Sequence, residues 1–134
     1  MSEAEAVRSV LVGHGSMAEG LVDAVRHITG CPPDTLVAIS NRGMSPESLA
    51  AAVREVVGAG PAIIFTDLQS GSCGFAARRV AHECSDVVVV SAVNLPLLVD
   101  FAMNRTLPLH ELVPRLLERG RAAITCSPAE LPGS

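Results

Sequence analysis

Short apolar runs alternate along the chain with segments whose apolar residues recur at helical spacing. The apolar runs are rich in β-branched residues and nearly continuous, which is typical of strands buried on both faces of a parallel sheet. They predict strands at Ser9–Val12, Leu36–Ile39, Ala62–Phe65 and Val87–Val90. The segments between and after them predict helices at Met17–Thr29, Pro46–Gly58, Cys73–Cys84, Leu95–Met103 and Leu109–Arg119.

This order of elements predicts an α/β fold with three layers. Because strand–helix–strand units cross over with one hand, the helices are expected on both faces of a mostly parallel, open sheet. We expect the strand order 2-1-3-4, which makes the first and third strands neighbours. A short and weakly marked fifth strand is predicted at Ala122–Cys126. A single domain is expected over residues 1–126, with a loose C-terminal tail over residues 127–134.

The composition narrows the class of protein. The 134 residues carry a formal net charge of −4, which argues against nucleic acid as a partner because nucleic-acid binders present basic stripes. No apolar run approaches the ~20 residues that a membrane helix needs. The acidic start MSEAEAVRS is unlike a signal peptide. We therefore expect a cytoplasmic protein that does not insert into a membrane.

The cysteines and histidines do not predict a metal site. The four cysteines lie far apart and form no CxxC pair, so reduced thiols are expected. No two histidines have the spacing of metal ligands, and we expect neither a metal nor a cofactor. Three histidines accompany charged residues on predicted helices and are expected at the surface, namely His27, His82 and His110.

Polar residues are concentrated in the loops that follow the predicted strands, where open α/β sheets bind ligands. The first of these loops begins Gly13-His14-Gly15-Ser16-Met17-Ala18, which fits the dinucleotide pattern G-x-G-x-x-A. One hypothesis is therefore a small, non-catalytic nucleotide-binding module in which the Gly13-x-Gly15 loop receives phosphates. Ser40-Asn41-Arg42 stands where an acidic ribose partner is expected, although an arginine there could accept a 2′-phosphate instead. Against the hypothesis, the second half of a dinucleotide fold is missing.

The second hypothesis assigns the chemistry to His14. To attack phosphorus, its imidazole must be neutral, with one nitrogen available and the other held as a donor. Asp67 supplies a carboxylate at the end of the third strand, which faces His14 if the first and third strands are neighbours. Gly71 and Ser72 lie where the third helix begins, so two helix N-termini converge on one anion, as suits a phosphoryl group. Cys73 is expected to be a small buried residue.

Three segments resemble one protein family. VLVGHGSMAEGL, FTDLQSGSCGFAA and VSAVNLPLLVDF occur in the order and at the distances seen in enzyme IIA domains of the mannose-type (mannose/fructose/sorbose) phosphoenolpyruvate:sugar phosphotransferase system. The resemblance runs from about Val10 to Ile124. It implies a homodimer in which each subunit has a parallel four-stranded sheet and exchanges a fifth, antiparallel strand with its partner.

The resemblance also implies a phosphotransferase that carries a phosphohistidine. His14 would accept a phosphoryl group from the phosphocarrier protein HPr and pass it to a separate enzyme IIB, for sugar uptake or regulation. Asp67 would hydrogen-bond the ring nitrogen that is not phosphorylated. Gly15, Gly71 and Ser72 would contact the phosphate. Asn94, in the turn Asn94-Leu95-Pro96, would support the site.

The loop after Asp67 departs from the family pattern. The family usually reads D-x-x-G-G-S-P with an asparagine shortly after, whereas this chain reads DLQSGSCGF. His14, Asp67, Gly71 and Ser72 are all retained, which favours the phosphocarrier over the nucleotide-binding module. The changed positions bear on docking geometry and on the choice of partner.

Overall fold

The computed structural model describes residues 6–133. Four strands form one parallel sheet, and they are β1 (Arg8–Gly13), β2 (Val37–Ser40), β3 (Ala62–Thr66) and β4 (Val87–Val90). Five helices alternate with and follow them, and they are α1 (Met17–Thr29), α2 (Pro46–Val57), α3 (Gly71–Glu83), α4 (Leu95–Met103) and α5 (Leu109–Ala122). The sheet order β2-β1-β3-β4 confirms the predicted order.

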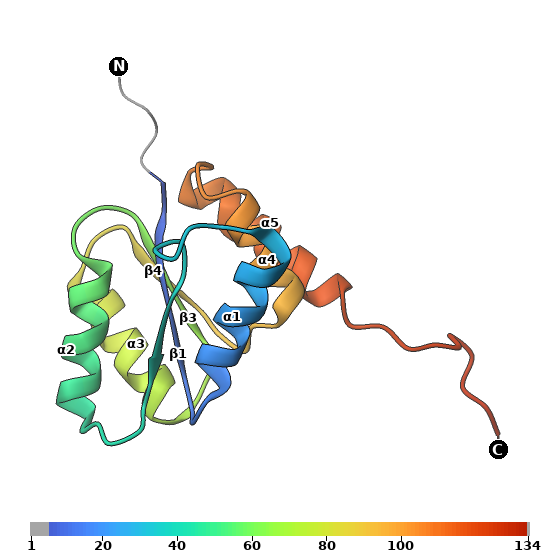
Figure 1. Ribbon diagram of the computed structural model, residues 1–134, viewed down its shortest axis with the longest axis horizontal. Helices are drawn as coiled ribbons and strands as arrows, with labels where there is room; N and C mark the ends of the chain where they lie inside the picture. Colours follow the sequence, from blue (N-terminus) through green and yellow to red (C-terminus); the bar gives the residue numbers. More distant parts are fainter. Residues whose placement is uncertain (1–5, 134) are drawn as a thin grey trace.

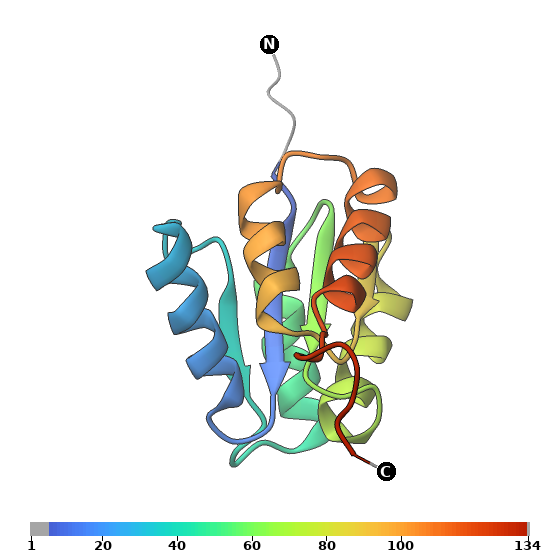
Figure 2. The same ribbon diagram turned by 90° about the vertical axis from the view of Figure 1, so that its right-hand side faces the viewer.

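The helices cover both faces of the sheet (Figure 1). Successive residues of a strand point to opposite faces, so Leu11 joins a core with α1, α4 and α5. Val10 and Val12 join a second core with α2 and α3. Figure 2 shows the first of these layers from outside, with α4 lying across the sheet between α1 and α5. The predicted three-layer architecture is therefore confirmed.

Local sequence explains where the helices begin and end. Ser45 accepts a hydrogen bond from the backbone N–H of Ser48, and Pro46 occupies the first helical position of α2. Gly30 ends α1 in the left-handed conformation that glycine adopts without strain. Helix α3 begins at Gly71, two residues earlier than predicted, and this places Gly71 and Ser72 in its first turn.

The predicted fifth strand is not formed within the single chain. Ala122 is the last residue of α5, and residues 123–126 belong to no strand. The segment after α5 leaves the body of the domain, and residues 121–133 are exposed (Figure 1). A strand at this place has no neighbour in its own chain, so its exchange between two subunits stays a prediction.

None of the helices in residues 6–133 combines the length and the apolar character that crossing a bilayer requires.

Candidate functional site

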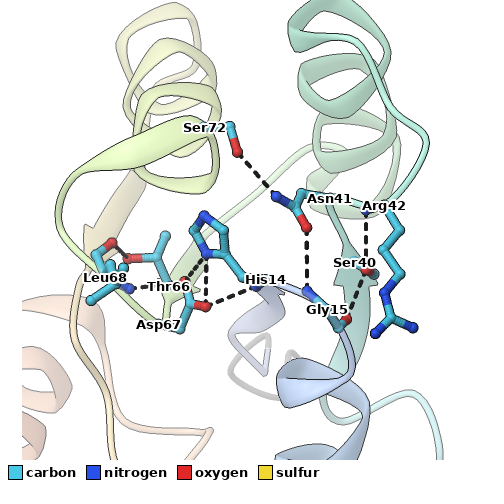
Figure 3. A network of polar contacts seen from close by, with 9 residues as sticks. All are labelled: His14, Gly15, Ser40, Asn41, Arg42, Thr66, Asp67, Leu68 and Ser72. Atoms are coloured by element: carbon cyan, nitrogen blue, oxygen red, sulfur yellow. Dashed lines mark hydrogen bonds and ion pairs between the residues drawn. The ribbon is translucent and has the colours of Figure 1, made fainter.

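Three neighbouring strands end at one edge of the sheet and present polar residues there. His14 follows β1, Asn41 follows β2, and Asp67 follows β3. Because β1 pairs with both β2 and β3, His14 lies between the other two residues (Figure 3). The expected convergence of His14 and Asp67 therefore occurs at the carboxyl edge, where open α/β sheets bind ligands.

His14 and Asp67 are joined by both backbone and side-chain contacts. The His14 ring nitrogen Nδ1 lies 3.0 Å from Asp67 Oδ2 and 3.2 Å from Oδ1. The backbone N–H of His14 donates to Oδ2 at 2.8 Å, and that of Leu68 donates to Oδ1 at 2.9 Å. The Asp67 side chain is only 5% exposed, whereas that of His14 is 40% exposed. The buried carboxylate is thus held in place, and it holds an imidazole ring that reaches solvent.

These contacts decide the ionisation of Asp67 and the tautomer of His14. Burial raises the pKa of Asp67, but the hydrogen bonds from the backbone and ring of His14 and from Leu68 outweigh it, so the pKa is lowered. The ionised carboxylate can only accept hydrogen bonds, so the Nδ1 atom beside it must carry the hydrogen. In the neutral ring, Nε2 then keeps its lone pair and is the nucleophilic nitrogen.

Nε2 lies beside the start of α3. A Cβ built on Gly71 would be 3.5 Å from Nε2, so the Gly71 backbone approaches the nitrogen that would carry a ligand. Gly71 has φ +87°, a conformation that residues with a Cβ rarely adopt. The glycine therefore makes a turn with positive φ that a side chain would strain, and it leaves room for a group bound to Nε2.

Two helix N-termini at this site lack side-chain caps. Ser16 before α1 and Ser70 before α3 accept no capping hydrogen bond, whereas Ser45 and Asn94 do cap α2 and α4. Uncapped backbone N–H groups and the positive end of the helix dipole favour an anion. The first turn of α3 also contains no acidic residue that would repel one. The first turn of α1 does contain Glu19, so the start of α3 is the end that better favours an anion.

Asn41 connects two of the predicted phosphate-binding residues. Its Oδ1 accepts a hydrogen bond from the backbone N–H of Gly15 at 3.3 Å, and its Nδ2 donates to Ser72 Oγ at 3.3 Å. The Gly15 amide, which both the nucleotide-binding hypothesis and the expected phosphate contact of Gly15 would use, is thus already engaged. Asn41 is the site residue whose role the sequence did not reveal, although it lies in a predicted ligand loop.

Asn94 has a structural position beside the site. Its Oδ1 accepts a hydrogen bond from the Leu97 N–H at 3.1 Å, and its Nδ2 donates to the Gly120 carbonyl at 2.9 Å. These bonds cap α4 and tie it to α5. In residues 6–133, no hydrogen bond connects Asn94 to His14 or Asp67, so its expected support of the site would act through the fold.

Cys73 lies behind the His14–Asp67 pair and is fully buried. Its sulfur, a His14 ring nitrogen and an Asp67 oxygen lie within 4.8 Å of one another, a grouping of potential metal ligands. Burial raises the pKa of the Cys73 thiol and the charge of Asp67 raises it further, although the Ser72 hydroxyl lowers it. Both Asp67 oxygens already accept hydrogen bonds. A cation would thus have to break the His14–Asp67 pair and deprotonate a buried thiol, so the donor set does not favour a metal.

The lowered pKa of Asp67 predicts a pH-dependent contribution to stability. A carboxyl group whose pKa is lower in the folded chain stabilises the fold above its unfolded pKa, which is about 3.9. That stabilisation is lost as the pH falls through the lower folded pKa. We expect the difference in unfolding free energy between wild type and Asp67→Asn to narrow as the pH falls from about 5 to about 2. Urea titrations across this range would measure it, and a constant difference would contradict the assignment.

The other histidines lie away from the site. His27, His82 and His110 are exposed on helices, as predicted. The fold and the site together define an open α/β protein with a histidine–carboxylate pair at the point where the winding of the sheet reverses.

Comparison with known proteins agrees with this class. The sequence matches the family described as "PTS system fructose IIA component" over residues 8–116, and the chain belongs to this family of phosphotransferase system IIA components. The predicted resemblance to mannose-type enzyme IIA is confirmed. A search of curated proteins gave no match.

Solved structures of similar fold point to the same system. Component EIIA of the phosphotransferase system from Streptococcus agalactiae is 25% identical with a TM-score of 0.82, over 90% of this chain and 96% of that one. The mannose/sorbose-specific IIA subunit from Enterococcus faecalis is 22% identical with a TM-score of 0.81, over 97% and 99%. A protein from Klebsiella pneumoniae described as a putative sugar phosphotransferase system permease is 24% identical with a TM-score of 0.77, over 94% of both chains.

Proposed function

We propose that this protein is a phosphocarrier in which His14 accepts a phosphoryl group from phospho-HPr and passes it to an enzyme IIB. The observation that carries the proposal is the Asp67 carboxylate, which accepts from Nδ1 at 3.0 Å and leaves Nε2 as the nucleophile. The family membership supports a phosphotransferase-type role. The expectations of a cytoplasmic location and of a homodimer belong to the same proposal.

The transfer is an in-line displacement at phosphorus. The Nε2 lone pair of His14 forms the new N–P bond while the N–P bond to the donor's imidazole breaks, and that electron pair returns to the donor nitrogen. Nδ1 of His14 keeps its proton throughout, so the phosphorylated ring is cationic. The donor ring reacts with a proton on its other nitrogen and therefore leaves as a neutral imidazole. Asp67, which is 5% exposed, stabilises this positive charge at short range.

The phosphoryl oxygens need hydrogen-bond donors on the opposite side of the ring. Ser72 lies on that side, in the first turn of α3, and Gly71 adjoins Nε2 (Figure 3). The uncapped N–H groups at the start of α3 add a positive potential. Transfer to the enzyme IIB is the same displacement in reverse, with that protein's acceptor as nucleophile.

The proposal predicts one acid-labile phosphoryl group on the protein. Wild-type protein incubated with phosphoenolpyruvate, enzyme I and HPr should gain a single phosphoryl group in intact-protein mass spectrometry. The His14→Ala protein should gain none, because it lacks the accepting nitrogen. Addition of a cognate enzyme IIB should remove the group. Equal labelling of wild type and His14→Ala, or no labelling of either by a competent HPr, would refute the proposal.

A further inference from the structure

Asn41 is the third polar residue of the site, and it has no part in the transfer steps proposed above. It follows β2 and reaches across the crevice to α3, where its Nδ2 lies 3.3 Å from Ser72 Oγ (Figure 3). Its Oδ1 lies 3.3 Å from the backbone nitrogen of Gly15. One side chain therefore links the loops after β1 and β2 to the first turn of α3.

The orientation of the Asn41 amide is fixed by its surroundings. The backbone N–H of Gly15 can only donate, so the amide oxygen must face Gly15 and the amide NH2 must face Ser72. The backbone of Asn41 is held as well, because its N–H donates to the Gly13 carbonyl and its own carbonyl accepts from the Met44 N–H. The NH2 group therefore faces Ser72 from a residue whose backbone is held in place.

This orientation determines what the Ser72 hydroxyl can do. Ser72 Oγ accepts from Asn41 Nδ2, so its own O–H hydrogen is directed elsewhere. The adjacent Cys73 thiol is a weak acceptor. A phosphoryl oxygen on His14 Nε2 is a strong, charged one, and a hydrogen bond to it is roughly twice as strong as one between neutral groups.

Building on the proposed function, we infer that Asn41 is a positioning residue that orients the Ser72 hydroxyl as a donor to the phosphoryl group in transit. Asn41 and Ser72 exchange no proton with the reacting atoms. They act by hydrogen bonding alone while the N–P bond to the donor breaks and the bond to Nε2 forms. The effect of Asn41 therefore has to disappear when Ser72 loses its hydroxyl.

Two substitutions separate this role from a merely structural one. Asn41→Ala removes both hydrogen bonds. Asn41→Asp keeps an oxygen for the Gly15 N–H but replaces the NH2 donor with a negative oxygen that accepts the Ser72 hydrogen and repels the phosphoryl group. If Asn41 positions Ser72, the Asp variant is the slower of the two. If Asn41 only tethers the loop, the Asp variant is the milder one because the tether to Gly15 survives.

The experiment measures steady-state transfer from phospho-HPr to each variant in full-length protein. We expect kcat to fall about tenfold for Asn41→Ala and about a hundredfold for Asn41→Asp, with the KM for phospho-HPr changed less than about twofold. Ser40→Ala is the matched control, because Ser40 Oγ donates to the Gly15 carbonyl at 2.8 Å and so tethers the same glycine without touching Ser72. Its kcat should stay within about twofold of wild type.

A double-mutant cycle completes the test. In the Ser72→Ala background, Asn41→Ala should lower kcat by less than about a further twofold, because the two residues act as one unit. Additive losses, an Asp variant faster than the Ala variant, or normal rates in both would overturn the inference while leaving a phosphorylated His14 intact. If wild type takes up no phosphoryl group, the proposed function fails and this inference falls with it.

Discussion

Asp67→Ala is expected to slow phosphorylation of His14 by about 10³-fold or more. The carboxylate contributes in two ways that the alanine cannot replace. It holds the hydrogen on Nδ1, and its charge offsets the positive ring that phosphorylation creates. Without it, the imidazole rotates, its hydrogen is shared between the two nitrogens, and fewer encounters present a nucleophilic Nε2 to phosphorus. Single-turnover transfer from phospho-HPr, followed by rapid quench, measures the rate.

Asp67→Asn and Asp100→Ala are the control variants whose phosphorylation rates are compared with that of Asp67→Ala. Asparagine keeps the shape of Asp67 but not the charge, so we expect a loss of about 10²-fold, smaller than for alanine. Asp100 in α4 is another mostly buried carboxylate, 10% exposed, and it accepts a hydrogen bond from Arg115 of α5. Its alanine variant should lose stability and keep the wild-type rate. Wild-type rates for folded Asp67→Ala would show that His14 needs no carboxylate.

The histidine–carboxylate pair could be predicted because it depends on topology alone. His14 and Asp67 directly follow two strands whose apolar runs are unambiguous, and adjacent parallel strands end at the same edge. Their side chains need only point into the crevice to meet. All five helices could be predicted because each rests on an apolar pattern repeated along many residues. The sheet order is not contained in that pattern, and its prediction rests on the winding typical of flavodoxin-like open sheets.

The strand predicted at Ala122–Cys126 is not formed in the single chain. Residues 122–126 are apolar enough for a strand, but a strand forms only where a neighbour pairs with it. In the isolated chain Ala122 instead completes the last turn of α5, after Gly120 packs against Leu97. Whether the segment becomes a strand thus depends on a second subunit, which the pattern of one sequence does not contain.

Asn41 could not be predicted as part of the site because its role depends on side-chain reach across three elements. Its position after β2 places it in a predicted ligand loop, but the sequence assigns it no role in the site. The bond to Ser72 joins residues 31 positions apart. Such a contact follows from the relative placement of α3 and the loop after β2, which is a property of packing and not of any local motif.

Gly74→Ala is expected to destabilise the fold by about 2–4 kcal/mol, the largest effect on stability that we predict. Gly74 lies in the first turn of α3, where a Cβ would clash with the Gln69 carbonyl oxygen and lie 2.9 Å from its carbon. Both are backbone atoms, and Arg78 donates to the same carbonyl, so neither can move without shifting the loop after Asp67. Urea unfolding at neutral pH measures the change in free energy.

Gly20→Ala is the matched control because it makes the same exchange inside another helix. Among residues 6–133, no atom beyond the adjoining backbone of α1 lies within 4 Å of a Cβ built on Gly20, so alanine meets no packed neighbour there. It should stabilise the protein by up to about 1 kcal/mol, since alanine favours the helix. The loop that Gly74 packs against leads from Asp67 to Ser72, so Gly74→Ala should also slow phosphorylation while Gly20→Ala should not. A Gly74→Ala variant as stable as the Gly20→Ala variant would show that the first turn of α3 relaxes freely. The close approach of Gly71 to His14 would then not depend on the absence of a side chain at Gly74.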